Sequence, residues 1–143
     1  MKHSNLPLRL KSFAKVNLYL QVLNKRKDNF HNLSTLFARI DLADTIILKR
    51  RNDSLIKISC DSRQVPQDKT NLCFRAAALL KQECNLKHGL EIEIKKRIPV
   101  GAGLGGGSSN AASVLSGLNK YWNLNLPKTK LLKLAVKLGS DVA

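Results

Sequence analysis

The sequence predicts an α+β fold in which a mostly antiparallel sheet carries its helices on one face. Strand-like alternation dominates the first 60 residues, and helix-like patterns with one more strand follow. Strands that come first, with helices collected later in the chain, are typical of α+β proteins rather than of parallel α/β folds. A chain of 143 residues with 43% hydrophobic residues is also long enough to bury a core within one domain.

The first predicted strand covers residues 8–23. Ala14 and Val16 fall on one face, whereas Lys15 and Asn17 fall on the other, and this period of two predicts a half-buried strand with a polar outer face. The alternation alone gives Lys15 no function, because the polar face of such a strand ordinarily meets solvent. Three short strands are expected next, and their consecutive order favours antiparallel pairing: residues 33–40, 45–50 and 55–60.

The second half of the chain has helical periodicity. Thr70 or Asn71 can cap a helix at its N-terminus, Gly139 ends the last helix, and Trp122 shares an apolar stripe that places it in the core. Helices are therefore predicted over residues 71–85, 109–122 and 128–138, with a strand over residues 90–98 between the first two.

A glycine-rich segment joins that strand to the second helix. Residues 101–109, GAGLGGGSS, which we call the glycine loop, contain five of the chain's eight glycines. Glycine raises the entropy lost on folding, so this density indicates sharp bends or a close approach to a ligand. A helix that starts near Ser108 or Ser109 would add unpaired amides and the positive end of its dipole. The segment therefore predicts a phosphate cradle.

Two familiar glycine motifs do not explain the loop. Gly101, Gly103 and Gly106 match G-x-G-x-x-G, but a dinucleotide site also needs an acidic residue about 20 positions further on, and residues 94–140 contain no Asp or Glu. The P-loop pattern fits except at its lysine, where Gly107 stands. Without that cation the P-loop interpretation fails as well.

The segment from Pro99 to Ala112, PVGAGLGGGSSNAA, instead resembles the nucleotide loop of the GHMP kinase superfamily. Three further segments, AKVNL at 14–18, RKDNFH at 26–31 and LGSDV at 138–142, resemble in the same order the branch that acts on 4-diphosphocytidyl-2-C-methyl-D-erythritol. The resemblance implies the two-layer amino-terminal domain of these kinases, a fold shared with a small-subunit ribosomal protein. It also implies ATP-dependent phosphorylation of the substrate's 2-hydroxyl, with Mg²⁺, in the methylerythritol phosphate route to isoprenoid precursors.

The resemblance implies roles for individual residues. Lys15 and Asp141 are expected to be catalytic and to lie within a few ångströms of each other at the mouth of the loop. Asn17, Phe30 and His31 are expected to bind substrate, with the aromatic-histidine pair holding the cytosine. ATP binding is implied for Asn71, Lys96, Pro99, Gly101, Gly103, Leu104, Gly105, Gly106, Gly107, Ser108 and Ser109. A plain N-cap explains Asn71 equally well, surface charge explains Lys96, and metal ligands stay unassigned.

Two residues depart from the family pattern. Asn29 stands where these kinases usually have Gly, and Phe30 stands where Tyr is common. Asparagine tolerates a positive φ better than most residues, and phenylalanine keeps a face on which a base can stack. We therefore expect the cytosine pocket to survive.

The net charge of +15, from 25 Lys and Arg against 10 Asp and Glu, favours polyanionic partners. Basic clusters at residues 25–27, 49–51 and 95–97 keep a nucleic-acid-binding module open as an alternative, and a GHMP kinase for another alcohol is a second. Only 5% of residues are aromatic, and a nucleic-acid module would not need the loop. We expect ATP and a cytidine-diphosphate-linked small molecule as partners, rather than nucleic acid.

Targeting features are few. Cys60, Cys73 and Cys84 have no C-x-x-C spacing, the first residues lack a signal-peptide core, and no apolar run reaches the ~20 residues of a membrane span. We expect no membrane partner, and a location in the bacterial cytoplasm or a plastid-type compartment.

The chain stops at Ala143, where the family usually continues with Pro and Phe. The resemblance implies that residues 1–143 are a truncated amino-terminal ATP-binding domain without its carboxy-terminal domain. We expect Asp141 to sit on a frayed terminus, activity to be weak, and uncovered apolar surface to favour self-association.

Overall fold

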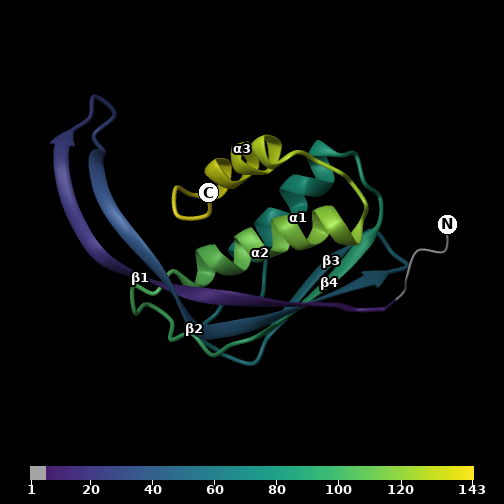
Figure 1. Ribbon diagram of the computed structural model, residues 1–143. Helices are drawn as coiled ribbons and strands as arrows, with labels where there is room; N and C mark the ends of the chain where they lie inside the picture. The colour runs from purple at the N-terminus through teal and green to yellow at the C-terminus, as the bar shows by residue number, and fades with distance from the viewer. Residues whose placement is uncertain (1–5) are drawn as a thin grey trace.

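The computed structural model describes residues 6–143 and confirms the α+β class, with three helices on one face of a four-stranded sheet (Figure 1). The prediction that the amino terminus is no signal peptide rests partly on residues 1–5, which lie outside the described residues. The elements are β1 (Leu8–Lys25), β2 (His31–Arg51), β3 (Ile56–Cys60), α1 (Leu72–Glu83), β4 (Gly89–Lys95), α2 (Gly106–Tyr121) and α3 (Lys128–Leu138).

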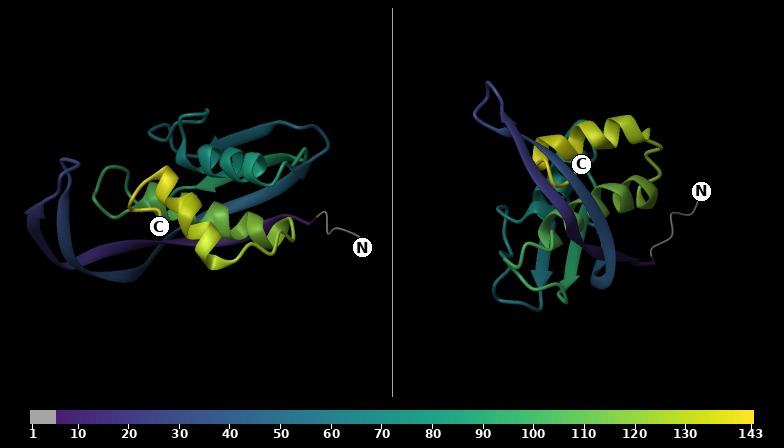
Figure 2. Two further views of the ribbon diagram at one scale, coloured as in Figure 1. Left: turned by 90° about the horizontal axis from the view of Figure 1, so that it is seen from above. Right: turned by 60° about the vertical axis from the view of Figure 1, so that its left-hand side comes forward.

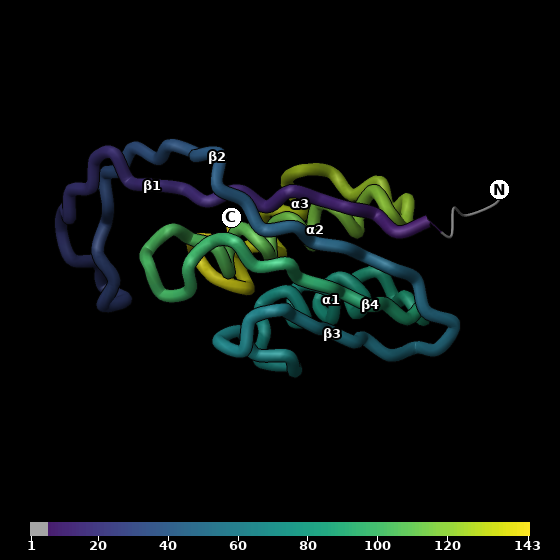
Figure 3. The backbone as a smooth tube through the Cα atoms, turned by 90° about the horizontal axis from the view of Figure 1, so that it is seen from below, coloured from purple at the N-terminus to yellow at the C-terminus, as the bar shows by residue number. Residues whose placement is uncertain are grey.

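The sheet has the strand order β1-β2-β4-β3, which Figure 3 shows from the side away from the helices. β2 pairs antiparallel with both β1 and β4, whereas β3 pairs parallel with β4. The prediction that the consecutive strands all pair antiparallel is therefore wrong for β3. The reason is its connection: α1 lies between β3 and β4 in the chain, and a crossover through a helix joins parallel neighbours.

The two strands predicted at residues 33–40 and 45–50 are one long strand, β2. Its register with β1 shifts at three places, between Phe13 and Lys15, between Asn17 and Tyr19, and between Val22 and Lys25. Such irregularities bend and twist a ribbon without ending it. The polar residues at 41 and 44 therefore lie within the strand rather than in a turn.

Beyond the bend the two strands continue alone as a hairpin, whose residues 17–37 we call the arm. Figure 2 shows the arm projecting from one end of the sheet, where no helix covers it. The half-buried strand predicted for β1 is wrong in this part, because apolar side chains of the arm are more than half exposed. They are Leu18, Leu20, Val22, Phe30, Leu33, Leu36 and Phe37.

The core lies between the sheet and the helices. Ile46 and Leu48 of β2 and Ile92 of β4 are fully buried beneath α1 and α2, and α3 packs against both helices. Trp122 is 6% exposed and belongs to this core, as predicted. Gly117 lets α2 approach β1 closely, since a Cβ there would clash with the side chain of Leu10.

The bounds of the helices and strands in the second half of the chain differ from the predicted ones mainly on either side of the glycine loop. α2 begins at Gly106, before the predicted Ser108 or Ser109, and β4 ends at Lys95 rather than at residue 98. The predicted bounds of α3 are confirmed. Among the described residues, no helix is both long and apolar enough to cross a membrane.

Candidate active site

A pocket of about 460 Å³ lies where the glycine loop, the start of α1 and the carboxy-terminal turn meet. This volume is within the usual range for small-molecule sites. Most of the ATP-binding residues predicted from the sequence line it, together with Asp141: Asn71, Lys96, Pro99, Gly101, Gly103, Leu104, Gly105, Gly106, Gly107 and Ser108. Gln64, Val65, Pro66 and Asn110 also line the pocket, and the sequence analysis did not single them out as ligand-binding residues.

The backbone of the loop is arranged to present amide groups. Gly101, Gly103 and Gly105 have φ values of 73°, 71° and 67°, a region that side chains disfavour. Gly105 is the N-cap of α2 and has no side chain that could accept a hydrogen bond from the helix's first amides. Because the first turn also carries no acidic residue, its amides and dipole favour an anion in the pocket.

Lys15 borders the loop from β1. Its backbone N–H donates to the carbonyl of Leu104 at 3.0 Å, and a Cβ on Gly105 would lie 2.9 Å from its Cε. Its ammonium donates to Asn17 Oδ1 at 3.3 Å and lies 4.4 Å from the centroid of the Phe37 ring. The absence of Cβ at Gly105 is therefore what lets the Lys15 side chain lie against the loop.

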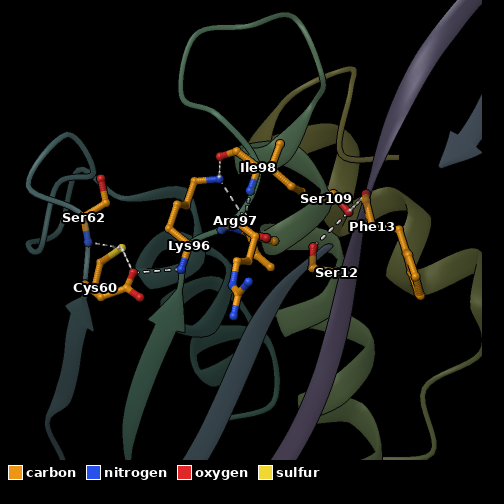
Figure 4. Close-up of polar contacts among 11 residues, drawn as sticks. Ser12, Phe13, Cys60, Ser62, Lys96, Arg97, Ile98 and Ser109 are labelled. Carbon is orange, nitrogen blue, oxygen red and sulfur yellow. Dashed lines mark hydrogen bonds and ion pairs between the residues drawn. The ribbon is translucent and has the colours of Figure 1, made fainter. Parts of the chain in front are cut away.

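Ser109, the last residue of the loop, faces the sheet rather than the pocket. Its hydroxyl donates to the carbonyl of Phe13 at 2.7 Å and accepts from the hydroxyl of Ser12 at 2.9 Å (Figure 4). These two bonds fix the first turn of α2 to β1. The predicted contact of Ser109 with ATP therefore stays a prediction, and the contacts of its side chain are structural.

Asp44, a fully buried carboxylate of β2, lies behind the loop. It forms an ion pair with Lys96 at 2.7 Å, and the Lys96 ammonium also donates to the carbonyl of Ile98 at 2.6 Å (Figure 4). Burial alone would raise the pKa of Asp44, but two backbone amides, the Lys96 ammonium and the Asn110 amide outweigh it and hold the pKa below its ordinary value. The Lys96 ammonium is therefore held by Asp44 and Ile98 rather than exposed as surface charge, and its predicted contact with ATP stays a prediction.

The buried polar residues of the described chain all belong to this region. They are Ser12, Asp44, Asn71 and Asn110. Burying a polar group is unfavourable unless the group finds a hydrogen-bond partner. Four buried polar side chains in one region therefore indicate that this region is built for more than packing. Ser12, Asp44 and Asn110 were not predicted as site residues. Asp44 carried a signal, because it alternates with the buried Ile46 and Leu48 and therefore falls on the core face of its strand.

Asn71 acts as the predicted N-cap. Its Oδ1 accepts from the amide of Cys73 at 2.8 Å, and its Nδ2 donates to the carbonyl of Pro66 at 2.7 Å. Both ends of the side chain are therefore occupied, and they hold the segment before α1 against the pocket. The predicted contact with the adenine is not tested by these bonds.

Asp141 lies in the turn after α3, exposed and on the rim of the pocket. The next residue, Val142, is 5% exposed, packs in the core, and donates its amide to Gly139 at 3.1 Å. Val142 therefore holds the described turn against the core, and the expected fraying of the terminus at Asp141 stays a prediction. Within residues 6–143, no ion pair of 4.0 Å or less joins Asp141 to Lys15.

The three predicted substrate residues lie outside the pocket. Phe30 is 72% exposed at the tip of the arm, His31 begins β2 beside it, and Asn17 lies near the base of the arm. Asn29 has a φ of 66°, as its replacement of a family glycine predicts. The structure thus forms a pocket at the glycine loop, while the residues predicted to hold the cytosine lie along a separate, exposed element.

The lowered pKa of Asp44 predicts acid-sensitive stability. A carboxyl whose pKa is lower in the folded chain stabilises it above the ordinary value, and that contribution is lost as the pH falls through the folded value. We expect Asp44→Asn to lower the free energy of unfolding by about 3 kcal/mol near pH 7, because it leaves the Lys96 charge buried. Urea unfolding at about pH 7, 5 and 3 should show the two proteins converging. A difference that is independent of pH would contradict the assignment.

Comparison with known proteins gives the chain relatives. A family model described as the GHMP kinases N terminal domain matches residues 71–143, more than half of the chain. Curated proteins named 4-diphosphocytidyl-2-C-methyl-D-erythritol kinase are similar over almost all of it: one from Chlorobium phaeovibrioides is 50% identical over 95% of this chain, and one from Clostridium perfringens is 44% identical over 94%. The chain spans about half the length of these relatives, 46% and 47%.

Solved structures agree with this relationship. The crystal structure of a 4-(cytidine 5'-diphospho)-2C-methyl-D-erythritol kinase is similar with a TM-score of 0.80 and 39% identity over 94% of this chain and 47% of that one. A mevalonate kinase with a TM-score of 0.69 is only 18% identical, so it shows the fold alone. The amide-lined pocket, the family match and these relatives agree, and the chain belongs to the GHMP kinases, whose N-terminal domain it contains.

Proposed function

We propose that the chain is the ATP-binding part of a kinase that phosphorylates the 2-hydroxyl of 4-diphosphocytidyl-2-C-methyl-D-erythritol. One observation carries the proposal: the pocket formed by the glycine loop and the uncapped start of α2 occurs in a chain 44% and 50% identical to proteins named for that activity. The amides would bind the ATP phosphates, and the apolar Val65 and Pro66, which also line the pocket, would contact the base. The pathway that such a kinase serves would be isoprenoid precursor synthesis.

Phosphoryl transfer depends mostly on alignment and on stabilisation of charge. Asp141 stands at the rim of the pocket and Lys15 lies against Gly105, so both border the place where the terminal phosphate would be held. We assign Asp141 to accept or orient the proton of the attacking hydroxyl and Lys15 to stabilise charge on the phosphate. Asn17 would position the ammonium of Lys15, to which it is already hydrogen-bonded.

The donor set of the pocket fits magnesium brought in with ATP. No group of three or more His, Cys, Asp or Glu residues gathers within the described chain to hold a metal unaided. Mg²⁺ commonly takes only one or two protein oxygens and completes its shell with water and substrate phosphates. Among the side chains that line the pocket, the Asp141 carboxylate and the Ser108 hydroxyl could supply such oxygens. When bound, the ion would neutralise phosphate charge.

The arm is the proposed site of substrate recognition. Phe30 offers an exposed ring and His31 an imidazole, a combination that can stack on a cytosine and hydrogen-bond its edge. The apolar residues of the arm are exposed, so we propose that the other half of a full-length kinase packs against them and completes the substrate pocket. Cytoplasmic or plastid localisation remains part of this proposal.

A thermal-shift panel tests the proposed function. We expect ATP to raise the melting temperature in proportion to the logarithm of its concentration, and CTP to do so less, because the pocket of the glycine loop binds the phosphoryl donor. An RNA oligomer should bind through the net charge of +15 alone, so its effect should fade steeply with salt. Sequence-selective RNA binding that persists near physiological salt, with no response to ATP, would favour a nucleic-acid-binding module.

A further inference from the structure

The two oxygens of the Asp44 carboxylate contact opposite ends of the glycine loop. Oδ1 accepts from the backbone amides of Arg97 at 2.6 Å and Ile98 at 2.8 Å, just before the loop. Oδ2 accepts from the side-chain amide of Asn110 at 2.9 Å, immediately after the loop, and from Lys96 at 2.7 Å. One buried side chain therefore joins the entrance and the exit of the segment that lines the pocket.

Lys96 strengthens the same connection. Besides its bond to Asp44, its ammonium donates to the carbonyl of Ile98, and a Cβ on Gly106 would lie 3.1 Å from its Nζ. The Lys96 ammonium therefore lies beside Gly106, the first residue of α2, and the Lys96 side chain is 9% exposed. The neighbouring strand contributes in parallel, because Ser12 is the cross-strand partner of Asp44 and bonds to Ser109, the residue before Asn110.

The orientation of the Asn110 amide follows from the ionisation of Asp44. An ionised carboxylate accepts hydrogen bonds and cannot donate them, so the NH₂ group of Asn110 must face it. The Oδ1 of Asn110 is left buried with no hydrogen-bond partner among residues 6–143, in a residue that lines the pocket. A buried polar atom without a partner is unfavourable, which is expected where a site is arranged for a ligand or a water rather than for stability alone.

We propose that Asp44 is a positioning residue for nucleotide binding: by holding both ends of the glycine loop it fixes the spacing of the amides that receive the phosphates. The inference rests on the proposed function, because it supposes that the loop binds a nucleotide. Asp44 itself lies behind the loop and does not line the pocket. Its effect on the ligand therefore passes through the loop backbone.

The substitution Asp44→Asn should affect the two ends of the glycine loop differently. The remaining carbonyl oxygen can still accept from Arg97 and Ile98, whereas the new NH₂ group would face two donors, Lys96 and Asn110. We expect the exit to loosen: the amide of Ser109, which donates to Gly105 at 2.9 Å, should exchange with solvent at least about tenfold faster in the nucleotide-free protein. The dissociation constant for ATP should rise by at least about tenfold, since a mobile loop must be ordered on binding.

Leu134→Ala is the matched control. It removes a buried side chain of α3 that does not line the pocket, so it lowers stability without touching the loop. We expect it to leave ATP affinity and Ser109 exchange near wild type under conditions where the protein is folded. If Asp44→Asn does not fold, Asn110→Ala breaks only the exit bond and keeps the ion pair. It should accelerate Ser109 exchange while Arg97 and Ile98 stay protected.

The two readouts separate this inference from the proposed function. If the wild-type chain binds no ATP but Ser109 exchange rises in Asp44→Asn and not in Leu134→Ala, the connection between the loop ends stands and the nucleotide proposal fails. Two results would overturn the inference when the wild-type chain binds ATP: Asp44→Asn binds ATP equally well, or its Ser109 amide exchanges no faster than in Leu134→Ala. In either case Asp44 is only a buried partner of Lys96.

Discussion

Replacing Gly105 and Gly106 together by valine is expected to abolish the stabilisation of the chain by ATP. Gly105 has a φ of 67°, which a β-branched residue avoids, and its new Cβ would lie 2.9 Å from Cε of Lys15. A Cβ on Gly106 would lie 3.1 Å from both Ile98 Cγ2 and Lys96 Nζ. The loop must therefore move, and the amides that it presents to the pocket move with it.

Circular dichroism should show that the double variant keeps its helices, because the substitutions lie at the start of α2 rather than in the core. Ser116→Val is the matched control, since it adds a β-branched side chain at an exposed position of the same helix, away from the pocket. We expect the control to melt at a higher temperature with ATP, as wild type does. An unchanged response to ATP in the double variant would show that the loop is not the phosphate site.

Extending the chain with the carboxy-terminal half of a close relative is expected to raise kinase turnover by about 100-fold or more. In the chain itself Asp141 is exposed on the rim, and the predicted substrate residues Phe30 and His31 lie on an arm that no helix covers. Misplacing reacting groups by about an ångström is enough for a loss of that size. The assay is ADP release that depends on both ATP and 4-diphosphocytidyl-2-C-methyl-D-erythritol.

Two controls make this result specific. The extended chain with Asp141→Asn should lose the gain, because it lacks the carboxylate assigned to the attacking hydroxyl while keeping the added surface. ATP stabilisation of the unextended chain should persist, because its pocket is formed within residues 64–141. Equal turnover by the short and extended chains would contradict the proposed arrangement and show that the arm needs no cover for catalysis.

The fold class and the position of the glycine loop could be predicted from the sequence because both depend on local patterns. Alternation located β1, helical periodicity located α3, and the density of glycine located the loop. The pairing of β3 with β4 could not be read in this way, because it depends on where α1 packs. The continuity of β2 through its polar residues was missed for a related reason: its register shifts are set by the partner strand.

The hydrogen bonds and the ion pair that hold the glycine loop from behind were the largest feature that could not be predicted from the sequence. Asp44 and Lys96 are 52 residues apart in the chain, and Ser12 and Ser109 are 97 apart, so no local window contains both members of either pair. The basic run around Lys96 left surface charge open as an explanation, because its partner Asp44 lies on another strand. A charged or polar residue in phase with a buried apolar face was the available signal, and Asp44 alternating with Ile46 shows it.

The pocket's composition also bears on how the chain folds. Its support and walls come from Ser12, Asp44, Asn71, Asn110 and Asp141, which are spread over nearly the whole sequence. Contacts between such distant residues are slow to form, because the loops that separate them must close first. The pocket at the glycine loop should therefore be among the last parts of the molecule to become native. We therefore expect ATP to lower the rate constant of unfolding more than it raises the rate constant of folding, because little of the pocket is formed in the transition state.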